Sequence, residues 1–468
     1  MLKKYKNIYT LLFFSIILIT IFSESSPLYR LNPWGDANIF YTIGKGMTEG
    51  LIPYKDLFDH KGPILYFMFG LTSIVSSTSF FGVYILEILC LYLTLLFSMK
   101  ILNLIDKEVN IYFILALGIF YCSSNAFGLG AGAAEEYIIP ILQISLYMSL
   151  KRIVENSSFK VGDSFTLGVL CAIVFYIKYN AVGFFLGLFI SLIIYQFNKN
   201  KKIIISCGLY AFLGFLTVTS LILVYFLMNN ALKDFINGYF IFNLFTYASS
   251  DRSLIQAILS VFKIILYYVI NNPFLVITSL LGIISVFFSK YSKYIKYAII
   301  LSFVSWYFVT FIGGVFIAYY ILPIVCFGIY INKFCTFKNS SSIFAILIVA
   351  LLIFTFPISR IRERLSTKNV QEIFSEEMYK YSKDPSLLML NTYDIGFYLA
   401  IDELPSCKYF TKINGPLNDL DITVNQCINS NNYDYLIAKD SNVYVKNYRI
   451  LKEYETYKLY INDDLIKK

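Results

Sequence analysis

The stretch that decides the architecture is Asn32–Phe67, NPWGDANIFYTIGKGMTEGLIPYKDLFDHKGPILYF, which follows the first long apolar segment of the chain. Apolar side chains between positions 36 and 47 recur at the spacing of an amphipathic helix. Gly50 suits a helix end, and Gly62-Pro63 suits the first turn of a second helix. The stretch therefore predicts two short helices joined by a polar loop.

The composition places the rest of the chain in a membrane. The 468 residues are 57% hydrophobic, 18% aromatic and 15% charged, whereas a soluble domain has roughly 25% charged residues. The mean hydropathy is +0.65. The formal net charge of +9 arises before Ile358, because basic and acidic residues nearly balance after it. Such an excess suits loops on the cytoplasmic side of a membrane and not a nucleic-acid patch.

Runs of roughly 20 apolar residues predict helices that span a membrane. Eleven runs fit this expectation: 7–23, 81–103, 111–127, 136–151, 162–178, 181–197, 203–228, 273–289, 297–314, 316–333 and 342–358. The first run is not followed by a small-residue cleavage site, so we expect it to stay as a span. Basic residues gather in the segments 3–6, 100–107, 151–160, 199–202, 290–296 and 333–338. All fall on one side, which makes that side and the N-terminus cytoplasmic.

Two further apolar runs fit the membrane surface better. Residues 63–78 are short, and we expect them to form an interfacial helix on the outer leaflet. Residues 254–271 are long enough to cross, but Lys263 near their middle would cost roughly 2.5–3.5 kcal/mol on insertion scales. A crossing here would also reverse the side of every later loop. We therefore favour an outer-surface or re-entrant helix, with a span as the alternative.

The tail changes composition sharply. SLLMLNT, DYLIA and YKLYI read as short buried strands, and residues 368–383 read as a helix. The expected fold is an all-α polytopic membrane protein of about 11 transmembrane helices, with a membrane domain at 1–358 and a small α/β extracytoplasmic domain at 359–468. Cys407 and Cys427 both lie in this tail. They can form a disulfide only if the tail lies outside the cytosol.

Candidate chemistry begins in the opening loop. Asp36 either caps the first helix or projects from its start into a polar cavity. Asp56, Asp59 and His60 either bind a divalent cation or act as acid and base, or they form a solvated loop that caps the next helix. Lys61 suits an anionic head group or phosphate. No cofactor is certain from these residues, and a divalent cation is one alternative.

The order of these features resembles the C-type, polyprenyl-phosphate-dependent glycosyltransferases, in the bacterial branch related to protein O-mannosyltransferases and aminoarabinose transferases. The run PYKDLFDHKGPILY (53–66) is the most specific match. The resemblance covers the membrane region and, more loosely, the tail. It implies that Asp36 is the catalytic base or a metal-associated acid, and it assigns Asp56 and Asp59 to the second acidic segment.

Other segments of the sequence agree with the resemblance. Glu135 and Glu136 resemble acids of the family's second outer loop, although acids at a helix start also give roughly 0.3–1 kcal/mol of stabilisation. Lys178, at the outer end of a span, resembles a donor-phosphate ligand or is a snorkelling side chain. Arg252 is a weaker candidate for the same role. The segment GGVFIAYYILP (313–323) lacks the histidine that the family commonly carries before its tyrosine, which weakens its case for a direct role.

The function implied is transfer of a sugar from a polyprenyl-phosphate donor to a glycan, lipid or protein acceptor of the cell envelope. Attack in one displacement with inversion would use Asp36 as base, while Lys61, Lys178 and Arg252 would stabilise the departing phosphate. The alternative is an envelope lipid or polysaccharide transporter or flippase, which would keep its key charges inside spans. Glu87 lies inside a span and is a functional candidate by that position alone.

Overall fold

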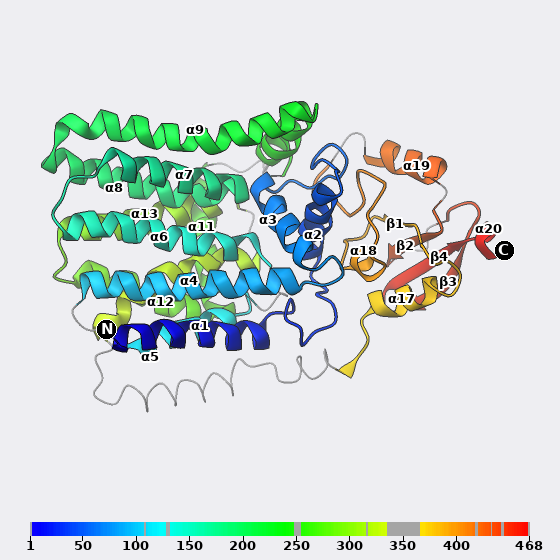
Figure 1. Ribbon diagram of the computed structural model, residues 1–468, viewed down its shortest axis with the longest axis horizontal. Coiled ribbons are helices and arrows are strands. Elements are labelled where there is room, and N and C mark those ends of the chain that lie inside the picture. Colours follow the sequence, from blue (N-terminus) through cyan, green and yellow to red (C-terminus); the bar gives the residue numbers. More distant parts are fainter. Residues whose placement is uncertain are drawn as a thin grey trace.

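The computed structural model describes residues 2–106, 109–127, 132–247, 254–314, 317–334, 366–416, 420–431, 433–440 and 444–466. The expected span 342–358 and the candidate Arg252 lie outside these residues. The described chain is mostly helical and ends in a small sheet. Figure 1 shows a bundle of long helices, two helices set across one end of it, and the sheet domain beyond them.

The bundle contains the apolar helices that the sequence predicts. In chain order they are α1 (Leu2–Phe22), α4 (Phe81–Ile105), α5 (Ile111–Cys122), α6 (Ala134–Val154), α7 (Val161–Ile177), α8 (Gly183–Lys199), α9 (Ile204–Met228), α12 (Pro273–Phe288) and α13 (Lys293–Phe311). A composite segment follows, made of η4 (Ala318–Ile324), α14 (Val325–Gly328) and η5 (Ile329–Phe334). Within the described residues, five helices are long and apolar enough to cross a membrane: Phe81–Ile105, Ala134–Val154, Tyr179–Lys199, Lys201–Met228 and Lys293–Phe311. The other apolar helices are shorter.

The two ends of the bundle differ in charge. The connections α6–α7, α8–α9 and α12–α13 lie at the end far from the sheet domain (Figure 1) and carry the lysines of segments 151–160, 199–202 and 290–296. We call this the lysine-rich end. The opposite end, which we call the domain end, carries the opening loop and the sheet domain.

Helices α2 (Gly35–Thr48) and α3 (Pro63–Val75) lie across the domain end (Figure 1). Their bounds agree with the two helices predicted from the opening stretch. Gly44 of α2 packs on the backbone of α3, where an added Cβ would lie 2.5 Å from the Gly70 nitrogen. Gly50, just after α2, has φ +91, a conformation that glycine adopts without steric cost.

The sequence left open whether the segment that forms helix α11 (Leu254–Asn271) crosses the membrane. The element before it, the π-helix η3 (Ile236–Tyr247), is held at the domain end by Asn243, whose side chain donates to the His60 carbonyl at 2.7 Å. At the other end of α11, Asn125 donates to the Asn271 carbonyl at 2.6 Å, in the connection between α5 and α6. Both neighbours of α11 are thus anchored at the domain end, as expected for a helix that does not cross the bundle.

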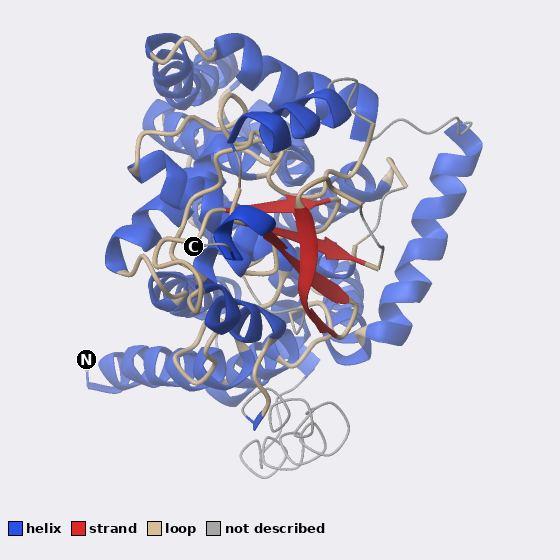
Figure 2. Cartoon of the chain, turned by 90° about the vertical axis from the view of Figure 1, so that its right-hand side faces the viewer, coloured by secondary structure: helices blue, strands red, loops and turns tan. Residues whose placement is uncertain are grey.

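The C-terminal domain is built on a four-stranded sheet in the order β1-β2-β4-β3. β1 (Leu387–Leu390) runs parallel to β2 (Tyr435–Lys439), while β4 (Tyr457–Asn462) is antiparallel to β2 and to β3 (Tyr448–Tyr454). Four helices accompany the sheet: α17 (Val370–Met378), α18 (Phe397–Ala400), α19 (Leu420–Asn431) and α20 (Asp463–Ile466). Figure 2 shows these strands in front of the helical bundle, facing the viewer. The three strands expected from the sequence are confirmed.

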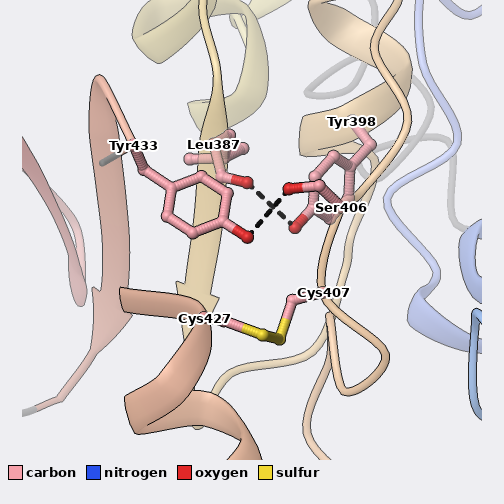
Figure 3. Close-up of a disulfide and its surroundings, with 6 residues drawn as sticks. All are labelled: Leu387, Tyr398, Ser406, Cys407, Cys427 and Tyr433. Carbon is pink, nitrogen blue, oxygen red and sulfur yellow. Dashed lines mark hydrogen bonds between the residues drawn. A yellow bond between two sulfur atoms is a disulfide. The ribbon is translucent and has the colours of Figure 1, made fainter. Parts of the chain in front are cut away.

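A disulfide joins Cys407 to Cys427 across a sequence separation of 20. It links the segment after α18 to helix α19, beside hydrogen bonds from Tyr398 to the Leu387 carbonyl and between Ser406 and Tyr433 (Figure 3). The sequence left this pairing open, and the structure shows the two cysteines bonded.

Replacing Cys427 by serine is expected to lower the stability of the C-terminal domain by about 3 kcal/mol, the value for a closed loop of similar length. Thermal unfolding of the full chain followed by circular dichroism would measure the change. Cys207→Ser, at a free and half-buried cysteine, is the control. Equal melting of both variants and the wild type would contradict the prediction.

Candidate active site

Asp36 lies in the first turn of α2 and is half-buried. Trp34, and not Asp36, is the N-cap residue of this helix, and no side chain caps it. The Asp36 carboxylate instead accepts a hydrogen bond of 2.5 Å from the Tyr319 hydroxyl. Trp34 packs edge-on against the same Tyr319, with ring centroids 5.2 Å apart. The structure therefore gives Asp36 a partner in the segment of Tyr319 and not the capping role.

The loop before α3 forms a buried polar chain. Tyr66 donates to Asp59 at 2.7 Å, and Asp59 Oδ1 lies 3.3 Å from His60 Nδ1. The other ring nitrogen of His60 lies 3.0 Å from Lys61 Nζ. These distances fit a neutral imidazole that donates from Nδ1 to Asp59 and accepts from Lys61 at Nε2. Asp59 and His60 thus orient the Lys61 ammonium.

Burial and neighbouring charges set the ionisation of Asp59, His60 and Lys61. Burial would raise the pKa of Asp59, but the charge of Lys61 and the contacts with His60 outweigh it and hold that pKa well below its usual range. Burial and the Lys61 charge lower the pKa of His60. Burial would also lower the pKa of Lys61, but Asp59 and then Asp36 raise it. Near neutral pH Asp59 is therefore a carboxylate, His60 a neutral imidazole and Lys61 an ammonium.

Lys178 brings a second buried cation to the same place. It is the C-cap residue of α7, and its ammonium pairs with Glu135 in the first turn of α6. Lys178 Nζ also lies 3.2 Å from the centroid of the Tyr320 ring, a cation–π contact. The second oxygen of Glu135 is buried and has no hydrogen-bond partner among the described residues. The pair is therefore buried without being fully satisfied.

A small cavity separates these elements. It is lined by the opening loop, the start of η1 (Tyr179–Val182), η3 and η4, through His60, Lys61, Gly62, Lys178, Tyr179, Asn180, Tyr239, Asn243, Tyr247 and Tyr320. Two ammonium groups, two side-chain amides and four phenol rings thus surround one space. Such donors suit an anionic group with several acceptor oxygens. The space measures about 20 Å³, which is room for a water-sized group, so a phosphate would enter only as the lining side chains move apart.

The C-terminal domain packs along the length of α2. Thr42 donates to the buried Asp394 at 3.1 Å, and Lys45 pairs with Asp402 at 2.6 Å. Tyr393 lies against the start of α2, where its Cβ would be 3.4 Å from a Cβ added at Gly35. Asp36 is close enough to Tyr393 for its charge to raise the pKa of that phenol, which burial also raises. The domain therefore forms one wall beside Asp36.

The remaining predicted residues lie elsewhere. Asp56 accepts from the Ile52 amide at 2.8 Å and so holds a tight turn. Glu136 accepts from the Ala133 amide at 2.9 Å, and Glu87 accepts from Ser23 at 2.6 Å and from Ser25 at 3.2 Å. The described part of the chain contains no cluster of three His, Cys, Asp or Glu side chains that could hold a metal ion. The predicted acids thus do not share one site: Asp56 holds a turn, Glu136 contacts the start of its own helix, and Asp59 and Glu135 contact residues that line the cavity.

Tyr319, Tyr320, Tyr247 and Tyr393 belong to the site but were not among the predicted site residues. The sequence did mark the segment that holds Tyr319 and Tyr320, but the missing histidine lowered its weight. Tyrosine is so frequent in this chain, at 40 residues, that its presence gave no signal of its own. Only the fold brings these four phenols to one place.

A family model described as "Putative competence-induced protein Ccs4 N-terminal domain" matches residues 2–358. The chain belongs to this family. The Ccs4 N-terminal domain match includes the bundle helices, α2, α3 and every polar group that lines the cavity, and it stops before α17 of the sheet domain. Its description refers to induction during competence and names no reaction. No curated protein matches the chain.

Proposed function

We propose that the chain is a membrane glycosyltransferase that moves a sugar from a polyprenyl-phosphate donor to a cell-envelope acceptor. The observation that carries the proposal is the half-buried Asp36 beside a cavity lined by the buried cations Lys61 and Lys178. A lipid-phosphate donor would present its phosphate at the membrane surface, where these groups lie if the bundle spans the membrane. The cell-envelope acceptor is a glycan, a lipid or a protein.

The proposed reaction follows from the positions of the charges. Asp36 takes the proton of the acceptor hydroxyl, whose oxygen attacks the anomeric carbon as the bond to the donor phosphate breaks, with inversion. Lys61 and Lys178 stabilise the negative charge that grows on the departing phosphate, and the electrostatic effect is strong because both ammonium groups are buried. His60 and Asp59 position Lys61 and take no part in bond making. A divalent cation is not required by this scheme.

The proposed topology places the domain end outside the cytosol. About 11 helices would span the cytoplasmic membrane, with the N-terminus and the lysine-rich end in the cytoplasm. The Cys407–Cys427 disulfide supports an extracytoplasmic position for the C-terminal domain. Anchoring of both neighbours of α11 at the domain end supports the same count of spans.

A transporter or flippase is the second candidate, favoured by Glu87. This carboxylate is buried inside the bundle and held by Ser23 and Ser25, and carboxylates at membrane depth often belong to transport pathways. The glycosyltransferase explains more of the site, because Asp36, Lys61 and Lys178 gather at the domain end and not along a path through the bundle.

The test is a transfer assay in membranes that contain the chain. We expect label to move from a polyprenyl-phosphate sugar, and not from a nucleotide sugar, to an envelope acceptor fraction. Membranes without the chain give the background. Absence of transfer from a panel of polyprenyl-phosphate hexoses and pentoses, with vesicle assays showing movement of the lipid across the bilayer, would instead establish the transporter.

A further inference from the structure

A second cavity lies on the side of the bundle, far from Asp36. It has a volume of about 570 Å³ and lies between α7, α8 and α9, with the buried Phe159 also in its lining. Its lining is almost wholly apolar, and includes Leu167, Cys171, Phe212 and Phe215. Ligand cavities typically measure roughly 300–1,000 Å³. This cavity, which we call the groove, is therefore large enough to hold a flexible hydrocarbon chain.

The groove opens where lipid would surround the bundle. Helix α9 lies along one edge of the bundle (Figure 1) and is largely exposed along its length. Ile205 and Phe212, which line the groove from α9, are 84% and 56% exposed. An added Cβ on Gly208, also in the lining, would meet no atom within 4 Å. The surrounding medium can therefore enter the groove directly.

Four lysines flank the same groove at the lysine-rich end. Lys160 follows the lining residue Phe159, and Lys199, Lys201 and Lys202 lie in the α8–α9 connection, next to lining residues of both helices. All four are exposed, and none forms an ion pair with a described carboxylate. Asp163, the acid nearest to Lys160 in the chain, is already held by Arg152 at 2.8 Å.

We propose that this groove binds an anionic phospholipid, with one acyl chain against α7, α8 and α9 and the phosphate head group against the lysines. The charge complementarity selects this occupant over a neutral lipid. Each lysine near an anionic membrane surface adds electrostatic attraction, and the four lysines lie next to lining residues at one end of the groove. The bound lipid fills the groove alongside α9, and it does so independently of any transfer reaction at the domain end.

The experiment uses the full chain in detergent, with phosphatidylglycerol and phosphatidylcholine as probes. Phosphatidylglycerol is expected to raise the melting temperature of the wild type, and phosphatidylcholine is expected to raise it much less. Native mass spectrometry is expected to show one phosphatidylglycerol retained. Equal effects of the two lipids would show a non-selective lipid shell and overturn the proposal.

Two variants test whether the lipid binds in the groove or elsewhere on α9. Gly208→Trp fills the groove, and Leu221→Trp places the same ring on a lipid-exposed position of α9 outside the lining. Only Gly208→Trp should lose the retained lipid. Should Gly208→Trp fail to fold, Lys201→Gln with Lys202→Gln tests the head-group contact against Lys290→Gln with Lys293→Gln at the same end. Loss of the phosphatidylglycerol effect in both double variants, or in neither, would overturn the assignment.

Discussion

Replacing Lys178 by methionine is expected to lower the free energy of unfolding by about 3–5 kcal/mol, the range for removing one member of a buried ion pair. The side chains of Lys178 and Glu135 are only 6% and 3% exposed. Without the ammonium, the buried Glu135 carboxylate would lose its ion-pair partner, and its second oxygen already lacks a hydrogen-bond partner among the described residues. The cation–π contact with Tyr320 would be lost as well.

The double variant Lys178→Met with Glu135→Gln is expected to recover most of this loss, because it leaves no unpaired buried charge. Lys151→Met is the control: its pair with Glu155 spans 3.9 Å and is about half exposed, so its removal should change stability by at most about 1 kcal/mol. Reversible unfolding in mixed micelles would measure all four proteins. A double variant no more stable than Lys178→Met would contradict the interpretation. In the transfer assay the double variant should stay impaired, since the proposed phosphate contact is gone although the fold is restored.

The helices of this chain could be predicted because their signals are local. The apolar spacing after Asp36 and the Gly62-Pro63 pair fix α2 and α3 within a few residues, without any knowledge of the fold. Strand β3 was missed for an equally local reason. Its sequence, YRILKEY, carries basic and acidic residues at an exposed sheet edge, so the buried-strand pattern that revealed β1, β2 and β4 is absent.

The site was predicted only in part because its contacts are distant in sequence. Asp36, Lys61 and Lys178 were each recognised from their neighbourhoods and do gather at the domain end. Their partners were not predictable, since Tyr319 meets Asp36 across 283 residues and Glu135 meets Lys178 across 43. Asp56 differs from these residues, because its contact is local in sequence. Its carboxylate satisfies an amide four residues away, a local use that composition alone cannot separate from chemistry.

The second large effect is expected at Asp36. The variant Asp36→Asn keeps the size of the side chain and can still accept the hydrogen bond from Tyr319, but it cannot take a proton from an acceptor hydroxyl. Loss of a general base typically costs about 10²–10⁴-fold in rate, so kcat for sugar transfer should fall by that factor. Stability should fall by no more than about 1 kcal/mol, because an acid in the first turn of a helix contributes only about 0.3–1 kcal/mol.

The matched control is Glu49→Gln, which removes an exposed carboxylate just after the last turn of the same helix. It should transfer sugar at the wild-type rate, so a loss seen only in Asp36→Asn cannot come from the net charge of α2. Comparing kcat with KM then separates two roles. A base acts on the chemical step, so kcat should fall while KM changes little, whereas an acid that only helped to bind the acceptor would raise KM with kcat kept. Full activity in Asp36→Asn would exclude this carboxylate from the mechanism and leave the cavity cations as a binding site without a base.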